Sequence, residues 1–218
     1  MYAAPVVALK KLPPKVDLRA QCPKAIYDQG QLGSCTGNAI AAAIHFYRIK
    51  QKRKPDFIPS RLFIYYNERA MEGTVDSNSG AQIRYGIKSV AQLGDCPETE
   101  WPYDIAKFAT KPGAACYRDA IKYKAVLYQR LAQTVNQMKG CLASGYPFVF
   151  GFSVYESFEG PQVAKTGVVP MPSSSEKQLG GHAVLAVGYD DVQQRFIVRN
   201  SWGSGWGMKG YFTIPYRP

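Results

Sequence analysis

The chain has 218 residues, a hydrophobic fraction of 46% and a formal net charge of +11 at pH 7. This length and apolar content are sufficient for one compact domain or for two lobes that share an interface. No apolar run approaches the roughly 20 residues that an α-helix needs to cross a bilayer, so the sequence excludes a membrane-spanning helix.

Three helices are predicted in the first half of the chain, after a short tail at residues 1–11. An alanine-rich run favours the first helix, at residues 34–49. A serine N-cap begins the second, at residues 60–71, and Gly94 ends the third, at residues 81–93. The first lobe is therefore expected to be helical.

The second half of the chain is rich in β-branched and aromatic residues, which Gly and Asp turns interrupt. Four strands are predicted, at residues 146–154, 182–189, 195–200 and 210–214. A helix is expected at residues 134–144, and a loop at residues 173–177 precedes the second of these strands. The second lobe is therefore predicted to be a β-barrel or a curled sheet, with the loop at residues 101–114 as the crossing point.

Three separated motifs supply the groups that thiol-based acyl transfer needs: QGQLGSC at residues 29–35, GHAV at 181–184 and NSWGSGWG at 200–207. They contain a thiol, an imidazole, an amide that can orient the imidazole, and a second amide six residues before the thiol. A thiol attacks a carbonyl well only as the thiolate, so it needs a neighbouring base and a positive environment. The order Gln, Cys, His, Asn indicates this chemistry.

Only two histidines are available for the role of base, His45 and His182. His45 falls in the alanine-rich helical run, with no nucleophile motif beside it, and is interpreted as a structural residue. His182 is therefore the predicted base. With so few histidines and no C-x-x-C or H-E-x-x-H spacing among the cysteines, we expect no metal site.

These motifs resemble the papain family of cysteine peptidases, in the style of its short bacterial and viral members, over residues 12–218. The family signature at the nucleophile is C-G-[SA]-C-[WY], with His and Asn about 130–150 residues downstream. Here the string is LGSCT, and His182 and Asn200 follow Cys35 by 147 and 165 residues. Leu32 replaces a cysteine that relatives usually tie in a disulfide, and Thr36 replaces an aromatic residue.

The resemblance implies an α+β fold of the papain type, with two lobes and an active-site cleft between them. After the tail, residues 12–218 form the peptidase domain. Its helical first lobe is expected at residues 20–108. Its β-barrel-like second lobe is expected at residues 109–218, with residues 12–19 crossing onto it.

The resemblance also assigns the catalytic roles. Cys35 is the nucleophile, and its place at a helix N-terminus favours the thiolate. His182 is the general acid and base, and Asn200 accepts a hydrogen bond from one ring N–H to fix the imidazole. The Gln29 side chain and the Cys35 backbone N–H form the oxyanion hole.

Substrate contacts follow from the same resemblance. The edge at residues 78–80 is expected to pair with an extended peptide through its backbone. Trp202 resembles the indole that shields the His–Asn hydrogen bond from water. The predicted substrate-binding residues are Gly33, Ser34, Ser79, Gly80, Ala81, Gly151, Gly181, Ala183 and Trp202.

The four other cysteines allow up to two disulfides in three connectivities. They are equally compatible with buried thiols, which behave as small hydrophobic groups. If a bridge forms, Cys96 with Cys116 is preferred because it closes a proline-rich loop. The lysines and arginines are scattered, with one cluster at residues 50–54 that is interpreted as a solvated helix end.

The predicted activity is that of an endopeptidase that forms an acyl-enzyme through Cys35. A peptide-binding homologue with weak catalysis is the alternative, because both flanks of the nucleophile motif depart from the family pattern. An aminopeptidase is a third possibility within the enzyme class. The expected partner is an extended peptide or protein substrate, bound by a monomer without a cofactor, metal or nucleic acid.

Two expectations concern the N-terminus. It lacks a basic leading segment and contains Pro5, so it is not predicted to be a signal peptide, and the compartment stays open. No helical prosegment is recognised in residues 1–11. We expect the chain to be active with this tail, because eleven residues bury too little surface to close a cleft strongly.

Overall fold

A computed structural model describes residues 12–125 and 127–216, so the expectation that the chain is active with its tail concerns residues that lie outside the described ranges. The structure divides into two compact units. Unit 1 combines the start of the chain up to Gln21 with the stretch from Gln129 onward, and unit 2 is the stretch Cys22–Tyr128.

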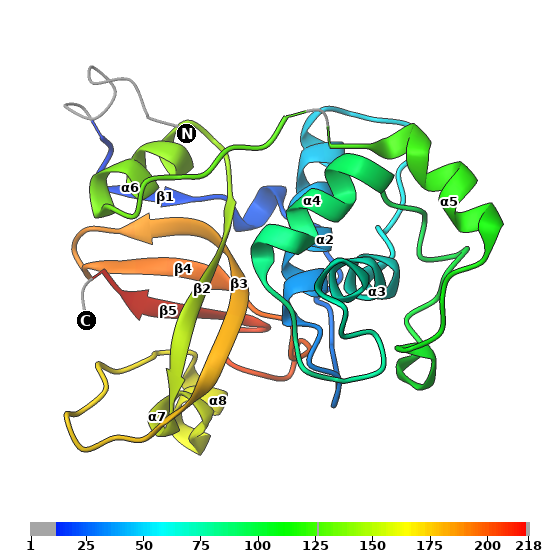
Figure 1. Cartoon of the computed structure of the whole chain (residues 1–218). Coiled ribbons are helices and arrows are strands. Elements are labelled where there is room, and N and C mark those ends of the chain that lie inside the picture. Colours follow the sequence, from blue (N-terminus) through cyan, green and yellow to red (C-terminus); the bar gives the residue numbers. More distant parts are fainter. Residues whose placement is uncertain (1–11, 126, 217–218) are drawn as a thin grey trace. The chain divides into compact units, whose positions relative to one another are not determined.

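Unit 2 is built around three helices, α2 (Cys35–Lys50), α3 (Arg61–Glu72) and α4 (Ile83–Leu93). The predicted cap of α3 is confirmed, because the Ser60 hydroxyl accepts a hydrogen bond from the Phe63 backbone N–H at 3.1 Å. Gly37 brings α2 close to α3, since a Cβ there would lie 2.8 Å from the Arg61 carbonyl oxygen. The shorter elements of this unit are η2 (Ile105–Lys107), α5 (Ala114–Ala120), which is labelled in Figure 1, and η3 (Ile121–Tyr123).

Unit 1 is built on an antiparallel sheet whose central strand is the long β3 (Gln178–Asp190). One side of β3 pairs with β4, while β2 and β1 share the other side, β2 along its first part and β1 at its end. β5 pairs with β4 at the far edge. The bounds of these partners are β1 (Lys15–Asp17), β2 (Phe148–Tyr155), β4 (Arg195–Arg199) and β5 (Tyr211–Pro215).

The predicted barrel is therefore an open sheet. Within the described residues, the order β1–β3–β4–β5, with β2 added to β3, leaves β2 and β5 unjoined. Five strands, one of them only three residues long, do not provide the pairing that closure requires. The helix α6 (Val135–Ala143) begins after a Thr134 cap, whereas α7 (Glu156–Glu159) and α8 (Pro161–Thr166) are short helices that the sequence patterns did not predict.

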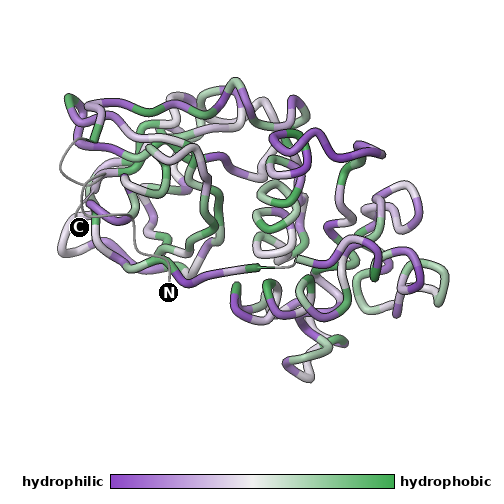
Figure 2. The backbone as a smooth tube through the Cα atoms, turned by 90° about the horizontal axis from the view of Figure 1, so that it is seen from above, coloured by the Kyte–Doolittle hydropathy of each residue, from purple (hydrophilic) through white to green (hydrophobic). Residues whose placement is uncertain are grey.

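The passage between the units comes later in the chain than the loop at residues 101–114. Residues 109–128, expected in the second lobe, belong to the helical unit. The physical reason is a buried apolar cluster in which Cys116 and Ala120 of α5 pack with Phe63 of α3. The tube in Figure 2 shows hydrophobic and hydrophilic stretches alternating along the backbone of both units. In the part of the chain that the structure describes, no helix is long and apolar enough to cross a membrane.

Candidate active site

The nucleophile motif lies in a turn that leads directly into α2. Cys35 is the first residue of the helix and is half-buried. Ser34 precedes it, and its carbonyl oxygen accepts the first helical hydrogen bond, from the Asn38 N–H at 3.0 Å. The first N–H groups of a helix lack partners within it, so they favour a negative charge. The prediction that Cys35 occupies a helix N-terminus is therefore confirmed.

Gln29 is buried at the start of the same turn. Its side-chain Nε2 donates a hydrogen bond to the Leu32 carbonyl oxygen at 3.0 Å. An amide nitrogen carries two hydrogens, and this bond uses one of them. The turn itself is therefore folded around the Gln29 amide, which fixes that side chain relative to the residues just before Cys35.

Tyr103 forms hydrogen bonds to this turn, a role that the sequence did not predict. Its hydroxyl donates to the Gln29 carbonyl oxygen at 3.0 Å and shares a 2.5 Å hydrogen bond with the Ser34 hydroxyl. Arg61 lies against the Tyr103 ring, with its guanidinium carbon 4.0 Å from the centroid, and forms a 2.7 Å ion pair with Glu98. Burial raises the pKa of Tyr103, so its hydroxyl keeps the proton that it donates.

Asn78 ties the nucleophile turn to the expected substrate edge. Its Oδ1 accepts from the Gly33 backbone N–H at 2.8 Å and from the Tyr65 hydroxyl at 2.9 Å. Gly80 has a φ of +75° and lies beside Gly33, since a Cβ on Gly80 would be 3.7 Å from the Gly33 carbonyl oxygen. The two glycines predicted to contact substrate are thus neighbours within unit 2.

Leu32 and Ala81 belong to an apolar cluster beside this edge. Leu32 is buried in an apolar cluster with Leu62 and Tyr65, against which Ala81 packs. Apolar packing and the Asn78 hydrogen bonds therefore hold this turn in place. Ser79 is exposed, and its hydroxyl donates only a long 3.4 Å bond to the Gly80 carbonyl oxygen.

We predict that Asn78→Ala lowers kcat/KM for peptide hydrolysis by about tenfold, because the turn that carries Cys35 loses its side-chain link to the substrate edge. The free energy of unfolding should fall by about 1 kcal/mol, since an exposed acceptor shared by two donors is removed. Ser77→Ala, in the same exposed turn, is the control and should change neither quantity. Equal kinetics for Asn78→Ala and Ser77→Ala would show that the link has no influence on the turn.

Thr36, which replaces the family's aromatic residue, makes a buried hydrogen bond to the carboxyl group of Glu68 on α3. Glu68 is completely buried, and its Oε2 lacks a hydrogen-bond partner among the described residues. It occupies space that a side chain at Gly86 of α4 would fill. Burial raises the pKa of Glu68 to about 8, and the hydrogen bond from Thr36 only partly opposes this effect.

The raised pKa makes the contribution of Glu68 to stability pH-dependent. Between its unfolded pKa of 4.5 and its folded pKa of about 8, the folded chain binds more protons, so stability falls as pH rises. At about 1.4 kcal/mol per pKa unit, the loss from pH 5 to pH 8 is on the order of 3 kcal/mol. We therefore expect Glu68→Gln to remove a decrease of this size from the free energy of unfolding, as urea denaturation at several pH values would measure.

Glu72→Gln is the matched control, because it makes the same charge change one turn further along α3 and leaves the buried carboxyl group in place. It should retain most of the pH dependence of the unmodified chain, because burial raises the pKa of Glu68 more than the Glu72 charge does. If Glu68→Gln and Glu72→Gln had the same dependence on pH, the buried carboxyl group would not be its source.

The histidine motif lies in unit 1, at the point where β3 becomes buried. His182 pairs with Phe152 of β2 across the sheet. Asn200 directly follows β4, and its Oδ1 lies 2.8 Å from His182 Nε2. Because a carbonyl oxygen can only accept, Nε2 carries the proton and Nδ1 is the other ring nitrogen available for proton transfer. The Ser201 backbone N–H also donates to Asn200 Oδ1, at 2.9 Å, and holds the amide in place.

Aromatic side chains enclose His182 within unit 1. The Trp202 ring stacks on the imidazole at a centroid distance of 4.9 Å and an interplanar angle of 28°. Phe152 and Phe158 approach it at 6.0 and 6.1 Å. Burial lowers the pKa of His182, and the hydrogen bond to Asn200 partly opposes this shift. The stacking agrees with the predicted position of Trp202 over the His–Asn pair.

Three further predicted substrate residues lie on the strands next to His182. Gly151 of β2 pairs with Ala183 of β3, and Gly181 pairs with Ser153. Gly151 and Gly181 are exposed, whereas Ala183 is buried. The structure thus groups the predicted residues of unit 1 around the histidine, and those of unit 2 around the cysteine.

His45 has the structural surroundings that the sequence predicted. It lies ten residues after Cys35 in α2, which is about 15 Å along a helix axis. Its Nδ1 contacts the Tyr27 hydroxyl at 3.3 Å, and its Nε2 lies 3.4 Å from a carboxylate oxygen of Asp56. His45 therefore links the C-terminal half of α2 to Tyr27 and Asp56, and it lies far from Cys35 along this helix.

The model of the papain family of cysteine proteases matches residues 12–217. The chain belongs to this family. The resemblance inferred from the sequence and the papain-like α+β fold are thereby confirmed. A papain-family assignment also agrees with the order of Cys35, His182 and Asn200 along the chain.

Two relatives share about half of their aligned residues with this papain-family chain. Xylellain, a cysteine protease from Xylella fastidiosa, has a crystal structure that matches with a TM-score of 0.93 and 50% identity over 99% of this chain and 84% of that one. An uncharacterized peptidase C1-like protein of Acanthamoeba polyphaga mimivirus is 52% identical over 198 residues, which cover 87% of this chain and 64% of the viral protein.

A more distant relative is procathepsin L of Mus musculus. It is 26% identical over 214 residues, which cover 94% of this chain and 60% of the mouse protein. The chain thus spans roughly three fifths of the length of the curated relatives named here.

Proposed function

We propose that this papain-family chain is a cysteine endopeptidase that hydrolyses peptide bonds through an acyl-enzyme on Cys35. The observation that carries the proposal is the 2.8 Å bond between His182 Nε2 and Asn200 Oδ1 beneath the stacked Trp202 ring. A histidine in a purely structural role has no need of a dedicated buried amide acceptor and an aromatic cover. The half-buried Cys35 at the start of α2 supplies the matching nucleophile.

In the proposed reaction, His182 Nδ1 takes the proton of the Cys35 thiol, and the thiolate attacks the peptide carbonyl carbon. Burial alone disfavours the imidazolium, as the lowered pKa of His182 reflects. A thiolate beside the ring reverses this preference, because an opposite charge favours the protonated form. Asn200 keeps Nε2 protonated, so the proton that is exchanged belongs to Nδ1.

The developing oxyanion would be stabilised by the Cys35 backbone N–H and the Gln29 amide. His182 then returns its proton to the leaving amine, which produces the acyl-enzyme and releases the first product. A water molecule, deprotonated by His182, attacks the thioester carbonyl and restores the thiol. Gly33 and Gly80 of unit 2 would offer their backbones to the extended substrate, and Gly151, Gly181 and Ala183 of unit 1 would line the neighbouring subsites.

Active-site titration with a thiol-reactive peptidyl epoxide tests this proposal. We expect one equivalent of epoxide to abolish turnover of an internally quenched peptide, with the adduct on the tryptic peptide that contains Cys35. Blocking both ends of the peptide distinguishes an endopeptidase from an aminopeptidase, because only the former cleaves it. Labelling at another cysteine, or full labelling of Cys35 with turnover retained, would contradict the mechanism.

A further inference from the structure

Two buried cysteines, Cys96 and Cys116, lie side by side in unit 2. Their sulfur atoms and a carboxylate oxygen of Glu100 all lie within 4.8 Å of one another. Cys96 follows α4 and is fully buried, whereas Cys116 lies in α5 with 5% of its surface exposed. None of the five cysteines is in a disulfide in this structure, so the two neighbours are present as thiols.

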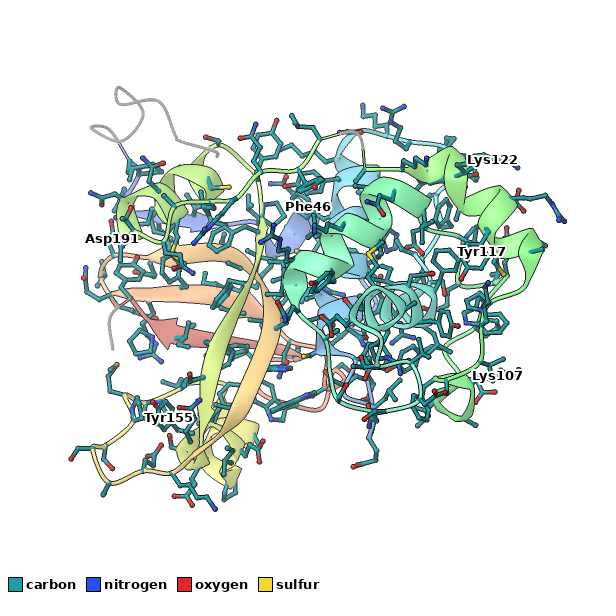
Figure 3. The ribbon with its side chains drawn as sticks, in the orientation of Figure 1. Phe46, Lys107, Tyr117, Lys122, Tyr155 and Asp191 are labelled. Carbon is teal, nitrogen blue, oxygen red and sulfur yellow. The ribbon has the colours of Figure 1, made fainter. Side chains whose placement is uncertain are left out.

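The surroundings of this thiol pair are apolar. Phe63 and Ala120 complete the buried cluster, and Trp101 and Tyr117 pack against it. Tyr117 projects from α5 in Figure 3, and its ring centroid lies 5.0 Å from that of Phe63. Burial, followed by the nearby Asp95 and Cys116, raises the pKa of Cys96. These surroundings therefore disfavour a charged thiolate at Cys96.

The pair could hold a metal ion or form a disulfide, and its surroundings favour one of these two possibilities. A metal ion held by Cys96, Cys116 and Glu100 would keep both sulfurs permanently as thiolates in this cluster, whereas disulfide exchange needs each thiolate only transiently. A disulfide is neutral and apolar, and it needs only a sulfur–sulfur separation of about 2 Å, which side-chain rotation of neighbouring cysteines can approach. Burial therefore favours the covalent bond over the ion.

We propose that Cys96 and Cys116 form a disulfide when the chain meets a small-molecule disulfide such as oxidised glutathione. Cys116 attacks one glutathione sulfur, and the first glutathione leaves as a thiol. Cys96 then attacks the Cys116 sulfur, the second glutathione leaves, and the two cysteine protons end on the two glutathione thiols. One sulfur–sulfur bond is broken in glutathione and one is formed in the protein.

The bridge would close the loop that supports the nucleophile turn. Nineteen residues lie between the two cysteines, and they include Glu98 and Tyr103. Tyr103 contacts Ser34 and Gln29, and Glu98 holds the Arg61 guanidinium that packs on Tyr103. Closing this loop restricts the unfolded chain and anchors the segment at both ends. The bond itself does not depend on the proposed peptidase activity.

Mass mapping of the full chain carrying Cys35→Ala tests the proposal without interference from the reactive nucleophile. The protein is equilibrated at increasing ratios of oxidised to reduced glutathione, unfolded in iodoacetamide and digested with trypsin. Cleavage after Lys88, Lys107 and Arg118 places the two cysteines on separate peptides, residues 89–107 and 108–118, since Pro112 protects Lys111. We expect these peptides to be joined with the loss of two hydrogens, and the thiol count to fall from four to two.

The oxidised protein should also melt about 5 to 10 °C higher than the reduced protein, and residues 97–115 should exchange their amide hydrogens more slowly. Cys141→Ala, which removes a buried cysteine of unit 1, is the matched control and should retain the linked peptides and the shift in Tm. The double variant Cys96→Ala with Cys116→Ala should lose both.

Three results would overturn the proposal. Both cysteines could remain alkylated at every glutathione ratio, or either one could be linked to Cys22 or Cys141 instead. The reduced protein could also bind one equivalent of Zn²⁺ on dialysis and lose it in the double variant, which would assign the pair to a metal. The mapping needs no substitution at Cys96 or Cys116, so a folding defect in the double variant would not prevent a decision.

Discussion

Cys35→Ala is expected to abolish peptide hydrolysis, with a fall in kcat of at least about 10⁴-fold at matched protein concentration. The methyl group cannot form the acyl-enzyme, and the side chain is half-buried at a helix start, where alanine is easily accommodated. The fold and peptide affinity should therefore survive. Hydrolysis of an internally quenched peptide measures the first effect, and fluorescence polarisation of a labelled peptide measures the second.

Cys141→Ala is the control for Cys35→Ala, since it removes a thiol that is buried in the other unit and donates only to the Tyr146 carbonyl oxygen. It should leave turnover per folded molecule unchanged. Residual turnover of Cys35→Ala within tenfold of the unmodified chain would disprove the assignment of the nucleophile. Undetectable turnover in the unmodified chain, with peptide binding intact, would favour the peptide-binding homologue instead.

The long helices and strands could be predicted from the sequence because each carries a local signal. The alanine-rich run and the serine cap placed α2 and α3 to within a residue at each end. α4 begins two residues later than predicted, since its cap is Gln82. The early start of β3 was not predictable, because residues 178–181 are exposed and include two glycines, so no buried pattern marks them.

The four proposed catalytic residues were identifiable because the chemistry restricts their type, order and spacing. The supporting residues were not, because tertiary contacts alone give them their roles. Tyr103 is 69 residues from its partner Ser34, and Asn78 is 45 residues from Gly33. Glu68 resembles an ordinary charged residue of a surface helix, yet it is fully buried because Gly86 leaves room for its carboxyl group. The sequence around a polar residue in a loop or helix contains no local pattern from which such a tertiary contact can be predicted.

His182→Ala is expected to lower kcat by at least about 10³-fold, nearly as severely as Cys35→Ala, because the thiol would lose its only proposed base. His45→Ala is the natural comparison, since it removes the chain's second histidine. His45 is buried against Tyr27 and Asp56, so its loss should lower the free energy of unfolding by about 1 kcal/mol without changing turnover per folded molecule. Turnover measured at matched folded concentration and urea denaturation separate the effect on kcat from the effect on stability.

The pH dependence provides a second test of which histidine acts. Burial lowers the pKa of His182, and Asn200 Oδ1 opposes that shift by accepting from the ring. Asn200→Ala should therefore lower the pKa of His182 further. It should also reduce kcat, because the imidazole would be less well oriented beneath Trp202. His45→Ala should leave the pH profile of kcat/KM unchanged. If His45→Ala abolished turnover while His182→Ala retained it, the roles of the two histidines would have to be exchanged.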